Sequence, residues 1–328
     1  MRKGTLMRRF GLVLLPLAFA LTLVAGSVAP AAEYPDRAIT LIAPYAPGGV
    51  TDLGARALAE AMERHLKKSV VVVNRPGGST TIGGNVVATA KPDGYTLGAF
   101  ASSAAVPEIY TYFYEAPYSS KDLKPVARIG APVLTITVKG DSPINSVKDL
   151  VEYARKNPGA KMAIHGKSTT GYLAMKTIAK QDNVSFVDVP FDGDTKIVPA
   201  ILGGHVPAGT PAYPGIAALL DAKQVRVLTL LIEKRAEFAP GIPTLVELGY
   251  KLPSGSFFGI FGPKGTPDAA VKKISDVMAM VSQERDYRDK MHKMGTQVLF
   301  EETKPFEKTV ILYKEKLQAF FKEEGLVK

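Results

Sequence analysis

The 328-residue sequence predicts an α/β fold with two lobes. Short apolar runs typical of buried strands alternate with stretches of helical periodicity, which is the order of a parallel α/β sheet. The alternation occurs in two blocks, and a strand and helices return late in the chain. This pattern suits a chain that crosses between two lobes twice, although spacing alone does not locate the crossings.

The first block runs from residue 39 to residue 100. Its first strand is a buried apolar run that stops at Pro44, and a Pro-Gly-Gly turn follows it. In order, we expect a strand at 39–43, a helix capped by Thr51 or Asp52 and ending near 68, a strand at 70–73, a short helix at 82–89 and a strand at 95–100.

The second block begins at an apolar, β-branched run and continues the alternation. Ser146 is an N-cap candidate, because serine accepts hydrogen bonds from the first amides of a helix. We expect strands at 133–138, 162–164, 184–189 and 225–231, helices at 147–156 and from about 171 to 180, and a further element near 199–202. The late return comprises a strand at 257–261 and helices at 267–283 and 306–324.

The first thirty residues have the order of a secretory signal peptide. Four basic residues precede an apolar run from Phe10 to about Val24, and small residues follow it. Ala29-Pro30-Ala31 fits the small-x-small cleavage rule, so we expect a signal peptide at 1–31 and a mature chain that starts at Ala32. The alternative, a retained membrane anchor, is disfavoured because the run is short for a span and contains Pro16.

Charge and cysteine content exclude several classes of function. Removing the leader takes away four of the 41 basic residues and none of the 31 acidic ones. The mature chain then has a net charge of about +6. This mild excess suits an anionic ligand, and without a basic block we expect no nucleic-acid partner. The sequence has no cysteine, so disulfides, thiol nucleophiles and a lipid-anchored N-terminus are excluded. The four histidines lack metal-ligand spacing, and we expect no cofactor.

Two turns between a strand and a helix are candidate anion sites. The first is Pro47-Gly48-Gly49-Val50-Thr51-Asp52, where glycines admit a ligand to the unpaired amides of a helix N-terminus. The second is 166–171 (GKSTTG), which adds hydroxyls and the Lys167 ammonium. A P-loop is excluded because position 161 is lysine rather than glycine. The alternatives are an ordinary capped turn and a solvated loop lysine.

Further polar residues follow other strands at the same predicted sheet edge, where ligands bind in open α/β sheets. They are Gly78, Ser79, Ser102 and Ser103. Catalysis has weaker support: Asp192 or Asp194 could act with His165, but Asp-Gly-Asp is more typical of a turn, and no Gly-x-Ser-x-Gly motif occurs.

Several segments resemble the Bug family, the TctC-like extracytoplasmic receptors of tripartite tricarboxylate transporters. The resemblance spans nearly the whole mature chain. It rests on 34–37 (YPDR), 44–52 (PYAPGGVTD), 74–78 (NRPGG), 92–97 (PDGYTL), 189–193 (VPFDG), 203–206 (GGHV), 243–249 (PTLVELG), 258–259 (FG) and 263–267 (PKGTP).

The resemblance implies a type II-like periplasmic-binding-protein fold, with a ligand cleft between lobes 32–131 plus 254–328 and 132–253. It implies a monomeric periplasmic receptor that delivers a small carboxylate to a membrane permease and performs no chemistry. The family's binding turns correspond to 45–52 and 166–172. The implied ligand-binding residues are Tyr45, Pro47, Gly48, Gly49, Val50, Thr51, Asp52, Gly78, Ser79, Ser102, Ser103, Gly166, Lys167, Ser168, Thr169, Thr170, Tyr172, Asp192, Thr210 and Tyr213.

The sequence departs from the family pattern in the second lobe. Lys167, Thr169 and Thr170 stand in a turn that is usually longer and rich in glycine and serine, and Tyr172 takes the place of a histidine. Lys167 would favour a second carboxylate, whereas Tyr45, Tyr172 and Tyr213 would instead line a pocket for an aromatic acid. Two other functions stay open: a ligand sensor that docks on a signalling partner, and an exported hydrolase or isomerase.

Overall fold

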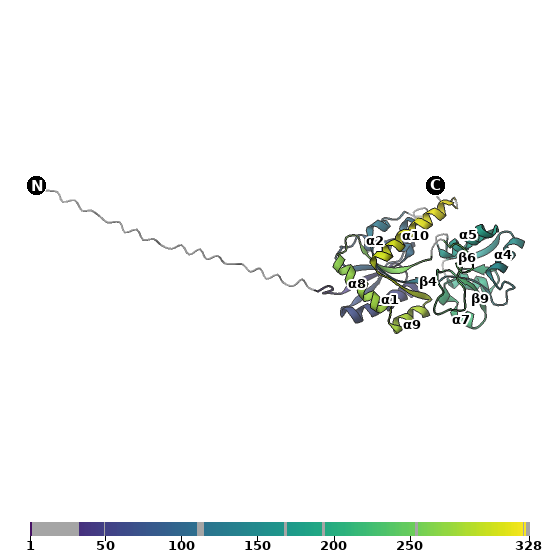
Figure 1. Cartoon of the computed structure of the whole chain (residues 1–328), viewed down its shortest axis with the longest axis horizontal. Coiled ribbons are helices and arrows are strands. Elements are labelled where there is room, and N and C mark those ends of the chain that lie inside the picture. Colours follow the sequence, from purple (N-terminus) through teal and green to yellow (C-terminus); the bar gives the residue numbers. More distant parts are fainter. Residues whose placement is uncertain are drawn as a thin grey trace. The chain divides into compact units, whose positions relative to one another are not determined.

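A computed structural model describes residues 33–48, 50–109, 115–166, 169–191, 194–252 and 255–323, together with Met1 and Gly325. Residues Tyr34–Lys328 form one compact unit (Figure 1). The predicted signal peptide at 1–31 lies outside the described residues, apart from Met1.

The first sheet has six strands in the order β11-β4-β10-β3-β1-β2. β1 is parallel to both β2 and β3, as the alternation predicts. β10 is antiparallel to β3 and β4, and β11 is antiparallel to β4, so the complete sheet is mixed. The strands are β1 (Ile39–Ala43), β2 (Val70–Asn74), β3 (Thr96–Ala101), β4 (Leu123–Pro132), β10 (Phe258–Pro263) and β11 (Thr296–Glu301).

Helices cover both faces of this sheet, because successive strand side chains point to opposite faces. Leu41 lies in the core with α1 (Val50–Leu66), α8 (Asp268–Val281) and α9 (Arg285–Lys293). Ile42 lies in the other core, with α2 (Thr81–Ala88), α3 (Ser102–Ala105) and α10 (Thr303–Glu323).

The second sheet has the order β7-β6-β8-β5-β9. β6 is parallel to β7 and β8, whereas β5 is antiparallel to β8 and β9. Its strands are β5 (Thr135–Lys139), β6 (Ala160–Ile164), β7 (Phe186–Pro190), β8 (Ala208–Gly209) and β9 (Val225–Leu230). Its helices are α4 (Val147–Lys156), α5 (Thr170–Asp182), α6 (Asp194–Leu202) and α7 (Ala217–Asp221). Short 3₁₀ turns occur at Gly78–Thr80, Pro107–Ile109, Ser120–Asp122 and Tyr213–Gly215.

The chain passes from the first sheet to the second between β4 and β5 and returns between β9 and β10, so two crossings occur, as predicted. The first crossing is held on both sides, because Val133 N donates to Gly295 O at 3.0 Å and Tyr213 N donates to Val133 O at 2.9 Å. The lobe boundary at 131/132 stays a prediction, and the one at 253/254 lies outside the described residues.

Most expected elements are present, with shifted ends. The helix at 147–156 and its N-cap are confirmed, since Ser146 Oγ accepts from Asp149 N at 3.1 Å. Thr51 and Asp52 do not cap α1, because the helix begins at Val50 and both residues lie in its first turn. The strand expected from Val133 begins at Thr135. β4, β8, β11, α3, α7 and α9 were not predicted from the sequence.

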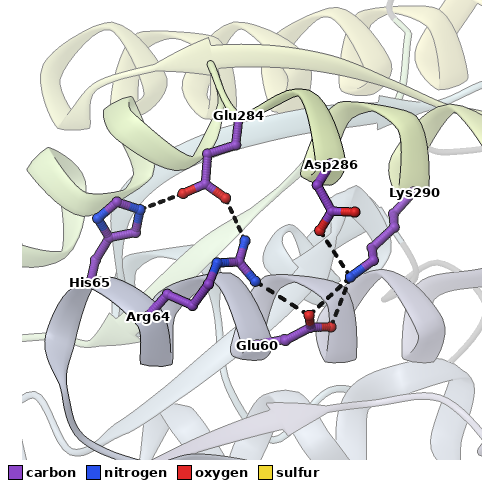
Figure 2. A network of polar contacts seen from close by, with 6 residues as sticks. All are labelled: Glu60, Arg64, His65, Glu284, Asp286 and Lys290. Atoms are coloured by element: carbon purple, nitrogen blue, oxygen red, sulfur yellow. Dashed lines mark hydrogen bonds and ion pairs between the residues drawn. The ribbon is translucent and has the colours of Figure 1, made fainter.

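A network of polar and charged side chains joins α1 to the start of α9 (Figure 2). Glu284, just before α9, accepts hydrogen bonds from Arg64 and His65 of α1. Lys290 of α9 in turn bonds to Glu60 at 2.9 Å and to Asp286 at 3.1 Å. Burial alone would raise the pKa of Glu284, but the hydrogen bonds from His65 and Arg64 outweigh it and lower this pKa.

We predict that Glu284→Gln lowers the free energy of unfolding near neutral pH by about 1 kcal/mol, because the carboxylate accepts hydrogen bonds from the Arg64 guanidinium and from His65. A lowered pKa stabilises the fold above the ordinary glutamate value of 4.5, and this contribution disappears as the pH falls below it. Urea denaturation near pH 7 and near pH 4 should therefore show a difference from the original protein that shrinks in acid.

The control is Asp276→Asn, which removes an exposed pair with Lys272 and should change stability by less than about 0.5 kcal/mol. An equal loss for Glu284→Gln at both pH values would contradict the assignment.

Candidate functional site

A cavity of about 250 Å³ lies where the carboxyl ends of β1, β3 and β6 meet the two crossings. We call it the crossing cavity. The lining includes six residues that the sequence predicted, all from turns and helix starts that follow strands of the two sheets: Tyr45, Thr51, Ser102, Ser103, Thr169 and Thr170. Two of the turns singled out from the sequence therefore meet at one cavity.

The first turn is held from beneath by the buried carboxylate of Asp52, which is 1% exposed. Asp52 accepts from Gly48 N at 2.8 Å, from Asn74 Nδ2 at 2.7 Å and from Arg56 Nε at 3.1 Å. Asn74 Nδ2 also donates to Tyr45 O at 3.0 Å, so the end of β2 supports the turn. Gly48 has φ 84°, a left-handed conformation that favours glycine.

The electrostatics of Asp52 follow from these contacts. Burial alone would raise its pKa, but the hydrogen bonds from Gly48, Asn74 and Arg56 outweigh burial and hold the pKa of Asp52 below its ordinary value. The carboxylate is therefore charged, and its oxygens accept hydrogen bonds from groups of the protein itself. Its role in the geometry is to position the start of α1.

The second turn leads from β6 into α5. Thr169 is the N-cap: its Oγ1 accepts from Tyr172 N at 3.4 Å and donates to Gly166 O at 2.8 Å. Gly171 allows the helix to approach β8 closely, because an added Cβ would lie 2.2 Å from Thr210 Oγ1. The predicted helix after this turn is confirmed, and its first turn faces the crossing cavity through Thr170.

His165 lies at the end of β6 and also lines the cavity. Its Nε2 is 2.9 Å from Asp194 Oδ1, which also accepts from Ala212 N at 3.0 Å. Because that carboxylate oxygen accepts hydrogen bonds, Nε2 carries the proton of this contact. Nδ1 is shielded from water and has no hydrogen-bond partner among the described residues.

The other polar side-chain groups of the described lining are hydroxyls. Tyr45 OH and Ser103 Oγ lie 3.0 Å apart, and Ser102 Oγ lies 2.8 Å from Ser256 Oγ. Among the described lining residues none is Lys, Arg, Asp or Glu. The described lining therefore offers neutral donors and the N-terminal turns of α1 and α5, which carry the positive ends of helix dipoles. Such an arrangement suits a small anion.

The other predicted site residues that the structure describes do not line the crossing cavity. Pro47, Gly48 and Gly78 are exposed in their turns, Gly166 is partly exposed, and Thr210 is buried beneath Gly171. Tyr172 is 2% exposed in the hydrophobic core, and the ring of Tyr213 packs 4.8 Å from that of Phe238. Gly49, Lys167, Ser168 and Asp192 lie outside the described residues, as do the side chains of Val50 and Ser79.

Some lining residues were missed. His165 was weighed only as a catalytic group, and Ala101, Pro132, Leu134, Ser256 and Tyr313 were not singled out. Ala101 is next to the predicted Ser102, so its position after a strand was a usable signal. Ser256 and Tyr313 are far from the two turns in sequence and carried no local signal.

The described part of the chain lacks two further features. No group of three or more His, Asp or Glu side chains is arranged to hold a metal ion. No helix in the described ranges is long and apolar enough to cross a membrane.

Comparison with known proteins gives concordant matches. Residues 54–326 match the family model of the tripartite tricarboxylate transporter family receptor, TctC. A Cupriavidus necator protein named "UPF0065 protein in gbd 5'region" is 31% identical over 310 residues, which cover 92% of this chain and 91% of the relative.

Two solved structures share the fold. The periplasmic binding protein BugD has 28% identity and a TM-score of 0.73, over 89% of this chain and 99% of BugD. Rpa4515 of R. palustris, solved with adipate, has 26% identity and a TM-score of 0.76, over 89% and 98% of the two chains. The predicted two-lobed α/β fold and the Bug-like resemblance are thereby confirmed.

We predict that Asp52→Asn destabilises the protein by about 2–3 kcal/mol, because it replaces a buried charged acceptor of several hydrogen bonds. The measurement is urea denaturation near pH 7. Asp141→Asn is the matched control, since Asp141 is 71% exposed and pairs only with Lys139 among the described residues. Equal effects of the two substitutions would show that Asp52 does not hold the turn.

Proposed function

The chain belongs to the tripartite tricarboxylate transporter receptor family, and from this membership we propose that it is an extracytoplasmic receptor for a small carboxylate. The observation that carries the proposal is the crossing cavity, where the first turns of α1 and α5 meet hydroxyl groups. Rpa4515, a relative of known structure, was solved with adipate, which supports a carboxylate ligand.

We assign the ligand-contacting roles to residues of the cavity. Thr51 and Thr170 stand in the first turns of the two helices, beside amides that have no intrahelical partner. Ser103 and Tyr45 supply hydroxyl contacts. The same proposal includes residues from the turns that the sequence analysis singled out, namely Gly49, Val50, Ser79, Lys167, Ser168 and Asp192.

We favour an aliphatic di- or tricarboxylic acid over an aromatic acid. An aromatic pocket would need the side chains of Tyr172 and Tyr213, but the first is buried in the core and the second packs on Phe238. The cavity of about 250 Å³ lies just below the range of roughly 300–1,000 Å³ of ordinary ligand pockets, which suits a compact ligand. His165 Nδ1 has no hydrogen-bond partner among the described residues, and with the proton on Nε2 it can accept a hydrogen bond from a hydroxyl or a protonated carboxyl group of the ligand.

We propose that the protein performs no chemistry. The pair of His165 and Asp194 is the arrangement that an enzyme could use as a base with its orienting carboxylate. In a receptor the same pair fixes the imidazole ring at the cavity wall. The family membership and the binding-protein neighbour BugD favour the second role.

The transport role completes the proposal. A ligand that binds one arrangement of the lobes more tightly increases the population of that arrangement. A membrane permease would then recognise the ligand-bound arrangement. We propose lobes at 32–131 plus 254–328 and at 132–253, a monomeric state, and a periplasmic location reached by cleavage of residues 1–31. The named location of BugD supports the last point.

The ligand prediction uses adipate as the first probe in a series of short di- and tricarboxylic acids. Adipate at about 100 times its dissociation constant should stabilise the fold by about 2.7 kcal/mol, visible as an upward shift in Tm. Dimethyl adipate, which lacks the charges, should give no shift. Thr51→Val and Thr170→Val should each weaken binding about tenfold, since each removes a hydroxyl beside a bound charge; Thr89→Val, outside the cavity, should not.

Two outcomes would contradict the proposal. Equal binding of the diester would show that charge is not recognised, and recovery of an altered acid after incubation would reveal an enzyme. Isothermal calorimetry and NMR of the recovered ligand distinguish these results.

The export prediction concerns the leader. Full-length protein expressed in a Gram-negative host should be recovered from the periplasm with an intact mass that begins at Ala32. Replacing Ala29 and Ala31 by bulky residues should block cleavage and leave the precursor. Recovery of uncleaved original protein in the cytoplasm would refute the assignment of residues 1–31.

A further inference from the structure

A second cavity lies on the other side of the return crossing. It measures about 380 Å³ and is bounded by β4, β11 and the segment that leads from β9 back to β10. We call it the Arg128 cavity. Ser256 lines this cavity as well as the crossing cavity, so the chain at residues 255–256 forms a wall shared by the two.

Arg128 of β4 is a buried guanidinium with one side unused. Its side chain is 8% exposed, and Nη1 donates to Glu301 Oε1 at 2.8 Å. Nε is shielded from water and has no acceptor among the described residues. A buried donor without an acceptor lowers the stability of the folded state, and the penalty is larger on a charged group. We therefore expect an acceptor to bind at this edge of the guanidinium.

The room beside Arg128 comes from an irregularity in the sheet. β11 pairs with β4 through Val298 and again through Glu301, which faces Arg128, with a register shift between them. Leu299 and Phe300 fall in this shift and line the cavity. Bulges of this kind occur often beside functional sites, where they redirect side chains and end regular pairing.

Most other charges of the cavity are already paired. Arg235 Nε bonds to both carboxylate oxygens of Glu247 at 3.0 Å, and Glu237 accepts from Arg288. Glu301, the partner of Arg128, also accepts from Thr309 Oγ1 at 2.7 Å. Within the described ranges, Lys234 and Glu233 are the lining charges with no assigned partner, and both are exposed.

We propose that the Arg128 cavity binds a small oxyanion, a carboxylate or a phosphate group, through the Nε and Nη2 edge of Arg128. This edge of a guanidinium presents two parallel N–H donors that match two oxygens of one anion. Glu301 accepts a hydrogen bond from Nη1 on the opposite side of the guanidinium and so fixes its orientation. The two N–H donors are therefore held in place before the anion binds. Lys234 adds a second positive charge at the rim.

The test follows the Nε–H group of Arg128 directly. Protein labelled with ¹⁵N-arginine is titrated with sodium acetate, with sodium phosphate, and with sodium chloride at equal ionic strength. The Arg128 Nε–H resonance, assigned by correlation to its backbone, should move and saturate with one of the two oxyanions but not with chloride. A larger response to acetate identifies a carboxylate site, and a larger response to phosphate identifies a phosphate site.

Arg226 is the internal control, because its guanidinium donates to the carbonyls of Gly140, Ser142 and Ile144 and should not respond. No movement of the Arg128 resonance overturns the proposal. A shift that grows linearly without saturation, from an adventitious ion only, also overturns it.

A matched substitution tests the geometry of the fork. Arg128→Lys keeps a positive charge for Glu301 but removes the bidentate edge, so equilibrium dialysis should show binding weakened about tenfold. Unchanged affinity would refute the proposal, and if this variant fails to fold, the titration of the original protein decides alone. The Arg128 shift should persist in Thr51→Val, which separates this site from the crossing cavity.

Discussion

The position of β10 in the middle of the first sheet constrains the rest of the molecule. The strand is made by residues that follow the second sheet in sequence, yet it pairs with β3 on one side and β4 on the other. The chain must therefore return from the second sheet to the centre of the first rather than to an edge. That return brings Ser256 to within 2.8 Å of Ser102, 154 residues earlier in the chain. The crossing cavity exists because of this return.

The charge distribution around the cavity follows from how the first turn is supported. Asp52 carries a buried charge. On the side of β2, Arg56 pairs with this charge and Asn74 donates a hydrogen bond to it. The described lining is left with hydroxyls and helix N-termini as its donors, because the N–H of the His165 imidazole is directed at Asp194. Neutral donors of this kind bind an anion without the desolvation penalty of a buried cation. The Arg128 cavity has the opposite character, because there the guanidinium itself is buried and half satisfied.

Local signals explain what sequence reasoning found. Strands β1 and β6 end in turns that lead directly into helices, so Thr51 and Thr170 were recognisable from their immediate neighbours. β4 was missed because Pro125 and Gly130 interrupt its pattern, although it lies between β11 and β10. Arg128 sits in that unrecognised strand. Its burial, like the contact between Ser102 and Ser256, depends on pairing between distant segments, which residue spacing does not encode.

Ser256 borders both cavities, so the segment at residues 255–256 is the route by which binding at one cavity would influence the other. Ser256 contacts Ser102 at the crossing cavity and also borders the space beside Arg128. A ligand that favours one arrangement of this segment changes the free energy of binding at the other cavity, and the change must be the same in both directions. Because the segment continues directly into β10, it cannot move without disturbing pairs with β3 and β4. The central strand that creates the cavity therefore also limits how far the two sites can influence each other.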